Sequence, residues 1–143
     1  SLSSSSAASD VYKRQVLLAS IMVPHTTLGP MKRIFQQLLA DEEGTFDIET
    51  GQQPRTGFAY NPTGVALLKV DEPTPAAIRK ALALARQEGA RYLGTWRHPD
   101  GPLVFLSTAV TQDESVARER VVATGQQAYF DLERCRTIAV PAH

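Results

Sequence analysis

Cysteine is almost absent from this chain, which has only Cys135 among its 143 residues. A single thiol cannot form an intrachain disulfide, so the cross-linked frameworks of small secreted domains are excluded. Net charge is also absent, because 15 lysine and arginine residues balance 15 aspartate and glutamate residues. Such a protein has no overall field that would draw it onto nucleic acid or an anionic membrane surface. We therefore expect a soluble cytoplasmic protein.

Long hydrophobic runs are missing as well. The apolar stretch at residues 16–23 follows Lys13 and Arg14, and so imitates a signal peptide. It is far too short to span a bilayer, and no small-x-small cleavage site follows it before Pro24 and His25. We expect no membrane partner.

The beginning of the chain differs in composition from the rest. Residues 1–9 are almost entirely serine and alanine, a composition that cannot bury a core. Residues 10–15 resemble the conceptual translation of a transposon end used as a sequencing adapter. We expect residues 1–30 to be a sequencing artefact or an untranslated leader, disordered, with translation starting at Met22 or Met31.

Signals for catalysis and cofactor binding are sparse too. The sequence has no phosphate-binding glycine loop and no metal-ligand spacing of cysteine and histidine, so we expect no metal and no cofactor. Cys135 lacks the neighbouring base and orienting group that an activated thiol requires. The enzymatic alternative is a shallow cleft at His98, Asp100 and Asp131, which requires these side chains to share a proton. We favour a protein without catalytic residues.

A short helix is predicted ahead of the main domain. Apolar side chains recur at helical spacing within residues 31–43, and Gly44 supplies a stop signal. Residues 44–143 then predict a single α+β domain, because this length suits one hydrophobic core.

Two further helices have clear start and stop signals. Thr74 caps the first and Pro75 occupies its first position, while Gly89 ends it. The second begins within residues 111–114, a capping-box pattern in which Asp113 is a rival cap. The helix side chains that we expect to be buried are Ile34, Phe35, Leu38, Leu39, Ile78, Ala81, Leu82, Ala85, Val116, Ala117 and Val121.

Three pairs of strands are predicted between and after the helices. Residues 91–110 have the densest β-branched and aromatic content and reverse through a turn at residues 98–101. An earlier hairpin is predicted over residues 57–70, and a last pair of strands over residues 127–140. The fold class is therefore α+β, with a mainly antiparallel sheet in ββαββαββ order and two helices packed on one face.

The best candidate binding surface lies on the central hairpin. Tyr92 and Trp96 share one strand face with Gly94 between them, which leaves a shallow groove. With Arg91 and Arg97 they form a candidate platform for a peptide, a base or a sugar. The alternative is that Tyr92 and Trp96 belong to the ordinary core, because the opposite strand face is the more polar one.

Four stretches of the chain carry a resemblance to other proteins. They are GTFDIETGQQPRTGFAY at residues 44–60, YLGTW at 92–96, VFLS at 104–107 and GQQAYFDL at 125–132. Over about residues 44–140, the chain resembles small uncharacterised α+β accessory proteins of phages and mobile elements of GC-rich bacteria. The resemblance implies a compact accessory protein of phage or mobile-element type and brings no catalytic residue with it.

These patterns together favour a non-enzymatic protein that acts by binding another macromolecule. The predicted elements form a complete fold without an assembled catalytic set, so we expect a protein partner. The enzymatic cleft is the second hypothesis, and nucleic acid binding through Arg118, Arg120, Arg134 and Arg136 is the third. The acidic residues interspersed among these arginines favour a solvated charged surface instead.

Overall fold

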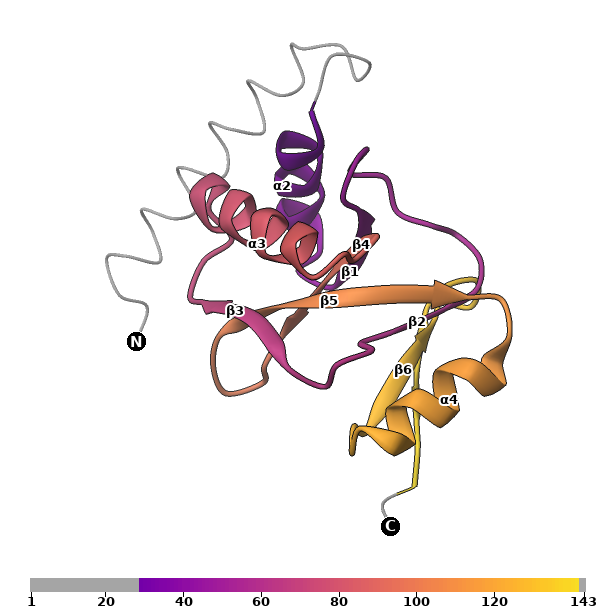
Figure 1. Ribbon diagram of the computed structural model, residues 1–143. Helices are drawn as coiled ribbons and strands as arrows, with labels where there is room; N and C mark the ends of the chain where they lie inside the picture. Colours follow the sequence, from indigo (N-terminus) through magenta and orange to yellow (C-terminus); the bar gives the residue numbers. More distant parts are fainter. Residues whose placement is uncertain (1–28, 142–143) are drawn as a thin grey trace.

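The structure of the protein is a computed structural model that describes residues 29–141 (Figure 1). Within this range the helices are α2 (Pro30–Ala40), α3 (Pro75–Gln87) and α4 (Glu114–Ala123). The strands are β1 (Gly44–Asp47), β2 (Phe58–Tyr60), β3 (Ala66–Val70), β4 (Tyr92–Arg97), β5 (Leu103–Thr111), β6 (Ala128–Asp131) and β7 (Arg136–Ala139). The expected artefact at residues 1–15, the signal-like run at residues 16–23 and Met22 lie outside the described residues.

Strand β5 is the element on which the sheet is built. One of its edges pairs with β4, from Leu103 opposite Arg97 to Thr108 opposite Tyr92. The other edge pairs with β3 and, further along, with β2. The described strands are antiparallel, in the order β1-β4-β5-β2-β6-β7, with β3 also beside β5. The predicted class, α+β with a mainly antiparallel sheet, is confirmed.

The central hairpin predicted over residues 91–110 is present as β4 and β5. Its turn is closed by two backbone hydrogen bonds, in which His98 donates to Pro102 O at 2.9 Å and Gly101 donates to His98 O at 3.2 Å. The last predicted pair of strands is likewise present, as β6 and β7. Both pairs join strands that are adjacent in sequence, so local turn chemistry was enough to locate them.

The hairpin predicted over residues 57–70 is wrong. β2 and β3 do not pair with each other but lie end to end along β5. Between them the Asn61 side-chain oxygen accepts a hydrogen bond from Thr63 N–H at 3.0 Å, and the Thr63 hydroxyl accepts one from Val65 N–H at 3.1 Å. These bonds close a local turn that bulges from the edge instead of reversing the chain. The nine residues of β5 have room for the three of β2 and the five of β3.

Helix boundaries follow the predicted capping residues. Thr74 Oγ1 accepts a hydrogen bond from Ala77 N–H at 3.1 Å and so caps α3. After α3, Gly89 has a φ of +75°, a conformation that suits glycine at a helix end. Of the two rival caps of α4, Asp113 is the one used, because its carboxylate accepts from Ser115 N–H at 3.0 Å.

Two separate hydrophobic clusters fill the interior of the described chain. In Figure 1, α2 and α3 lie together above β5, and α4 lies below it, against β2 and β6. The predicted packing of two helices on one shared face is not confirmed, because α3 contributes to the first cluster and α4 to the second. The first cluster consists of Ile34, Phe35, Leu38, Phe46, Ile48, Ile78, Ala81, Leu82, Ala85, Leu93, Leu103 and Phe105. The second consists of Ala117, Val121 and Tyr129, with Phe58, Tyr60, Ile138 and Val140 packed against them.

One helix residue that was predicted to be buried lies at the surface. Val116 is 42% exposed, whereas Ala117 and Val121 are fully buried. Ala117 and Val121 stand one helical turn apart and so share a face, and Val116 points away from it. The buried face of α4 is therefore narrower than predicted.

Candidate functional site

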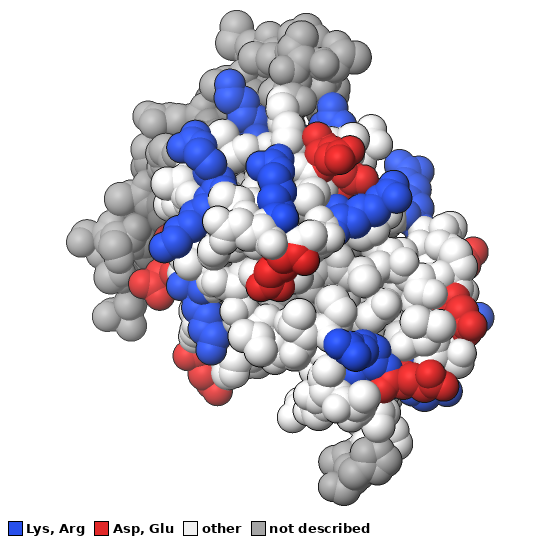
Figure 2. Space-filling view, in the orientation of Figure 1, with Lys and Arg blue, Asp and Glu red and all other residues white. Residues whose placement is uncertain are grey.

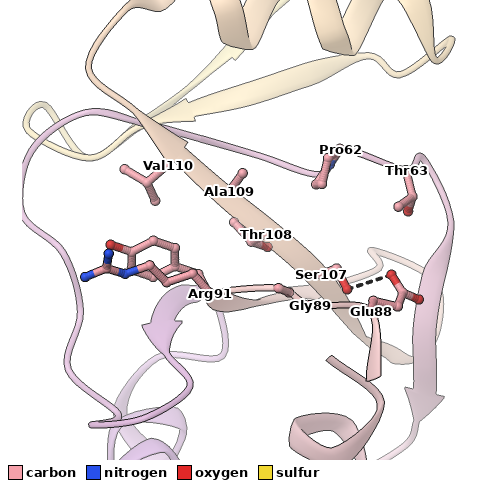
Figure 3. Close-up of a pocket in the computed structure, with 11 residues that line it drawn as sticks. Pro62, Thr63, Glu88, Gly89, Arg91, Ser107, Thr108, Ala109 and Val110 are labelled. Atoms are coloured by element: carbon pink, nitrogen blue, oxygen red, sulfur yellow. Dashed lines mark hydrogen bonds between the residues drawn. The ribbon is translucent and has the colours of Figure 1, made fainter. Parts of the chain in front are cut away.

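A surface groove crosses the middle of β5 (Figure 3). Ser107, Thr108, Ala109 and Val110 of β5 form its floor. The connection from α3 to β4 lies on one side, and the turn between β2 and β3 lies on the other. The cavity has a volume of about 320 Å³. Its lining consists of Pro62, Thr63, Glu88, Gly89, Ala90, Arg91, Tyr92, Ser107, Thr108, Ala109 and Val110.

A carboxylate and a buried hydroxyl meet at one end of this groove. Glu88 is the residue at the C-terminal cap of α3, and its side chain is exposed. Ser107 is 2% exposed, and its hydroxyl donates a hydrogen bond to Glu88 Oε1 at 2.9 Å (Figure 3). The bond holds the carboxylate against the groove floor. Within residues 29–141, no ion pair involves Glu88.

The opposite end of the groove has a positive charge. Figure 3 shows Arg91 and Glu88 on opposite sides of the floor formed by Thr108 and Ala109. The Arg91 guanidinium carbon lies 5.5 Å from the centre of the Tyr92 ring, and Arg91 Nε lies 3.9 Å from Asp47 Oδ2. The Arg91 side chain remains 77% exposed. A ligand in the groove therefore meets charges of opposite sign at its two ends.

The structure divides the four residues that were predicted to form a binding platform. Arg91 and Tyr92 line the groove, whereas Trp96 and Arg97 do not. The gap predicted above Gly94 is filled from the neighbouring strand, because a Cβ on Gly94 would lie 2.3 Å from Thr108 Oγ1. A continuous platform from Tyr92 to Trp96 is therefore absent.

Trp96 is a surface residue. Its side chain is 42% exposed, and its ring makes an edge-to-face contact with His98 at 5.3 Å between centroids. The opposite strand face is the one that packs into the first cluster, where Leu93 is fully buried and Thr95 is 6% exposed. The alternative that assigned Trp96 to the core is therefore wrong.

Arg97 stabilises the connection that follows α2. Its guanidinium donates two hydrogen bonds to the carboxylate of Glu42 and one to Gly101 O. The hydrogen bonds that Arg97 donates to Glu42, supported by the negative charge of that carboxylate, raise the pKa of Arg97. Both side chains are about 30% exposed, so the pair is partly desolvated. Arg97 is a structural residue in this fold.

The enzymatic alternative at His98, Asp100 and Asp131 has no geometric basis. His98 and Asp100 lie in the turn before β5, where the backbone N–H of Asp100 donates to His98 Nδ1 at 3.3 Å. Asp131 pairs with Phe58, which pairs with Thr111 at the far end of β5. Eight residue steps of about 3.3 Å separate the two ends of β5, or roughly 26 Å. Proton transfer requires hydrogen-bond distances, so these three residues cannot form one site.

Three of the four arginines predicted to contact nucleic acid have partners within the protein, and the fourth, Arg136, is exposed. Arg118 donates to the Tyr129 hydroxyl at 3.0 Å, and Arg120 Nε donates to Pro62 O at 2.7 Å. Arg134 Nε lies 3.9 Å from Asp131 Oδ2.

A larger group of basic residues lies on α2 and α3, neither of which contains an acidic residue. Figure 2 shows Lys and Arg side chains gathered over these two helices. The basic residues of the two helices are Lys32, Arg33, Arg79, Lys80 and Arg86.

One signal for the groove is present in the sequence at Ser107. Leu103, Phe105 and Ser107 alternate along β5, so they share the face that packs into the first cluster. A serine in register with two buried apolar residues needs a hydrogen-bond partner. Glu88 is that partner, and nothing in its local sequence distinguishes it from an ordinary helix-end residue.

Metal binding and similarity to other proteins give no further information about the site. Residues 29–141 contain no group of three or more histidine, cysteine, aspartate or glutamate side chains that could hold a metal ion. In the same range, no helix has both the length and the apolar character needed to cross a membrane. Comparisons of the chain with protein-family models, with curated proteins and with solved structures find no match.

Proposed function

We propose that this protein is a non-enzymatic binding module whose partner is another protein, and that the partner docks at the groove on β5. The groove of about 320 Å³ carries this proposal, because Glu88 and Arg91 place opposite charges at its two ends. Binding pockets are typically concave, mainly apolar, and equipped with a few polar groups that fix orientation. The floor at Ala109 and Val110 and the wall at Pro62 supply the apolar part.

A protein partner fits this groove better than a free cofactor. The cavity is at the lower end of the range for small-molecule pockets, about 300–1,000 Å³, and has space for one protruding side chain. Arginine and tyrosine, here Arg91 and Tyr92, are enriched among the residues that dominate protein–protein interfaces. A partner that contacted this rim would also reach the turn at Thr63.

The cellular setting is part of the same proposal. We place the protein in the cytoplasm of a bacterial host, as an accessory protein of a phage or mobile element. The free and exposed thiol of Cys135 suits a compartment that keeps cysteines reduced.

Affinity capture tests the proposed function. The full chain is immobilised at micromolar concentration and exposed to a lysate of the source bacterium, with Arg91→Glu and Arg79→Glu as paired variants. Both arginines are exposed, but Arg79 lies on α3 outside the groove. We expect wild type and Arg79→Glu to retain the same protein and Arg91→Glu to lose it. Recovery of no protein, or equal recovery by all three chains, would refute docking at the groove.

A second candidate function is nucleic acid binding by the basic surface of α2 and α3. The observation that favours it is the absence of acidic residues from both helices, with Arg79 and Lys80 exposed. Fluorescence anisotropy with a labelled DNA duplex should then show affinity that falls steeply with salt. Arg79→Gln and Lys80→Gln should reduce that slope, and Arg134→Gln should leave it unchanged. A flat salt dependence would eliminate this function.

A further inference from the structure

We propose that the groove on β5 receives a long basic side chain, lysine or arginine, from the partner, and that Glu88 recognises its charge. The inference rests on the proposed function and names the chemistry of the partner group that enters the groove. The position of Glu88, the lining of the groove and the partners of the neighbouring arginines support it.

Glu88 stands where two sources of negative potential coincide. It is the cap residue of α3, next to backbone carbonyls of the last turn, which carry the negative end of the helix dipole. A carboxylate at this position opposes the dipole, so the helix itself gains nothing from it. The bond from Ser107 occupies Oε1, and the remaining acceptor sites of this exposed carboxylate are open to a cation.

The rest of the groove suits the stem of such a side chain. Lysine and arginine bury an aliphatic stem along apolar surface and extend a charged head. Pro62, Ala109 and Val110 provide apolar surface along the groove. An acidic side chain in the same position would meet Glu88 and be repelled.

The arginines that flank Glu88 in the sequence are engaged elsewhere. Arg86 donates a hydrogen bond to Ile48 O at 3.2 Å. Arg91 lies over the Tyr92 ring and near Asp47, at the other end of the groove. Neither forms an ion pair with Glu88, so the carboxylate keeps its charge available for a partner.

The test uses a small lysine probe in place of the unidentified partner. N-α-acetyl-L-lysine methylamide is titrated into the ¹⁵N-labelled full chain, and N-α-acetyl-L-norleucine methylamide serves as the uncharged analogue. We expect saturable shifts at the amides of Glu88, Gly89, Ser107 and Thr108, and affinity for norleucine at least about tenfold lower, because only lysine can form the charge-assisted bond. Equal affinities, or shifts confined to other residues, would overturn the inference.

Paired variants identify the carboxylate that recognises the probe. Glu88→Gln should weaken lysine binding by about tenfold or more, and its amide oxygen can still accept the hydrogen bond from Ser107, so the fold is retained. Glu43→Gln removes the same charge from an exposed residue outside the groove and should leave the affinity unchanged. Unchanged binding by Glu88→Gln would refute the role of this residue.

The two proposals fail in different ways. If wild type captures a protein that Arg91→Glu does not capture, but the chain does not bind the lysine probe, the proposed binding module stands. Only the proposal that a basic side chain enters the groove is then refuted. If the chain binds the probe but captures no protein, the proposal of a protein partner is refuted. The proposal that the groove recognises a cation then stands.

Discussion

Gly94 is the position where one added methyl group tests the packing between β4 and β5 most directly. An ideal Cβ there would lie 2.3 Å from Thr108 Oγ1, and Thr108 is only 6% exposed. Backbone entropy alone would make alanine in a strand more stable than glycine by about 0.5–1 kcal/mol. Overpacking of a filled site costs about 1–3 kcal/mol. We therefore expect Gly94→Ala to lower the free energy of unfolding by about 1 kcal/mol.

A double-mutant cycle with Thr108→Ala separates the cost of the clash with Thr108 from the gain in backbone entropy that Gly94→Ala brings. The Thr108 hydroxyl donates to Leu106 O at 3.2 Å, so Thr108→Ala alone should cost about 1 kcal/mol. In the double variant the clash is gone, and Gly94→Ala should become neutral or stabilising. The coupling between the two sites should then reach about 1–3 kcal/mol.

The assay for this cycle is equilibrium urea unfolding, followed by far-UV circular dichroism and by the fluorescence of Trp96. Coincident transitions by the two probes establish a single cooperative step, which the free energies require. A stabilising Gly94→Ala, or strictly additive effects of the two substitutions, would mean that Thr108 Oγ1 does not occupy the space beside Gly94.

Three further predictions concern α4 and the second cluster. Val121→Asp should cost more than about 3 kcal/mol, because Val121 is fully buried and an unpaired charge would be trapped. Val116→Asp, at 42% exposed, should change stability by less than about 0.5 kcal/mol; thermal unfolding that shifts equally for both would contradict the assigned helix face. Asp113→Ala removes the N-cap of α4 and should cost about 0.5–2 kcal/mol in urea unfolding, whereas an unchanged midpoint would exclude the cap. Burial and a hydrogen bond to Glu114 raise the pKa of Tyr129 above its ordinary value of 10.0. Unfolded tyrosine therefore ionises first, and stability should fall as the pH rises above about 10. Tyr129→Phe should flatten that fall, and a pH profile parallel to wild type would contradict the assignment.

Elements that depend on neighbouring residues were predictable from the sequence. Thr74, Pro75 and Gly89 marked the ends of α3, because caps and helix-ending glycines act within one turn. The β4–β5 hairpin was predictable for the same reason, since its turn joins strands that are adjacent in the chain.

Pairings between distant segments were not predictable. The turn at Asn61 signals a change of direction, but it carries no information about which strand will pair with β2. That choice depends on the free edge of β5, about fifty residues further along the chain. Val116 was misplaced for a related reason, because helical spacing alone does not say how wide a face its neighbours cover.

The predicted surface was based on strand alternation, which identifies a strand face but not the residues that neighbour it. Tyr92 and Trp96 do share one strand face, as their spacing requires. Thr108 of the adjacent strand fills the gap between them, and only the Tyr92 end reaches the groove. Strand register, which a single sequence does not reveal, decided between a platform and two separated aromatic residues.

The groove depends on this register more than on its own side chains. Its lining comes from residues 62–63, 88–92 and 107–110, three segments that only β5 and its two edges bring together. A change in the pairing of β2 with β5 would carry Pro62 and Thr63 away from Glu88 without altering any of the three. The proposed binding surface is therefore a product of strand pairing, and substitutions in β2 or β5 can abolish it as effectively as substitutions in the groove.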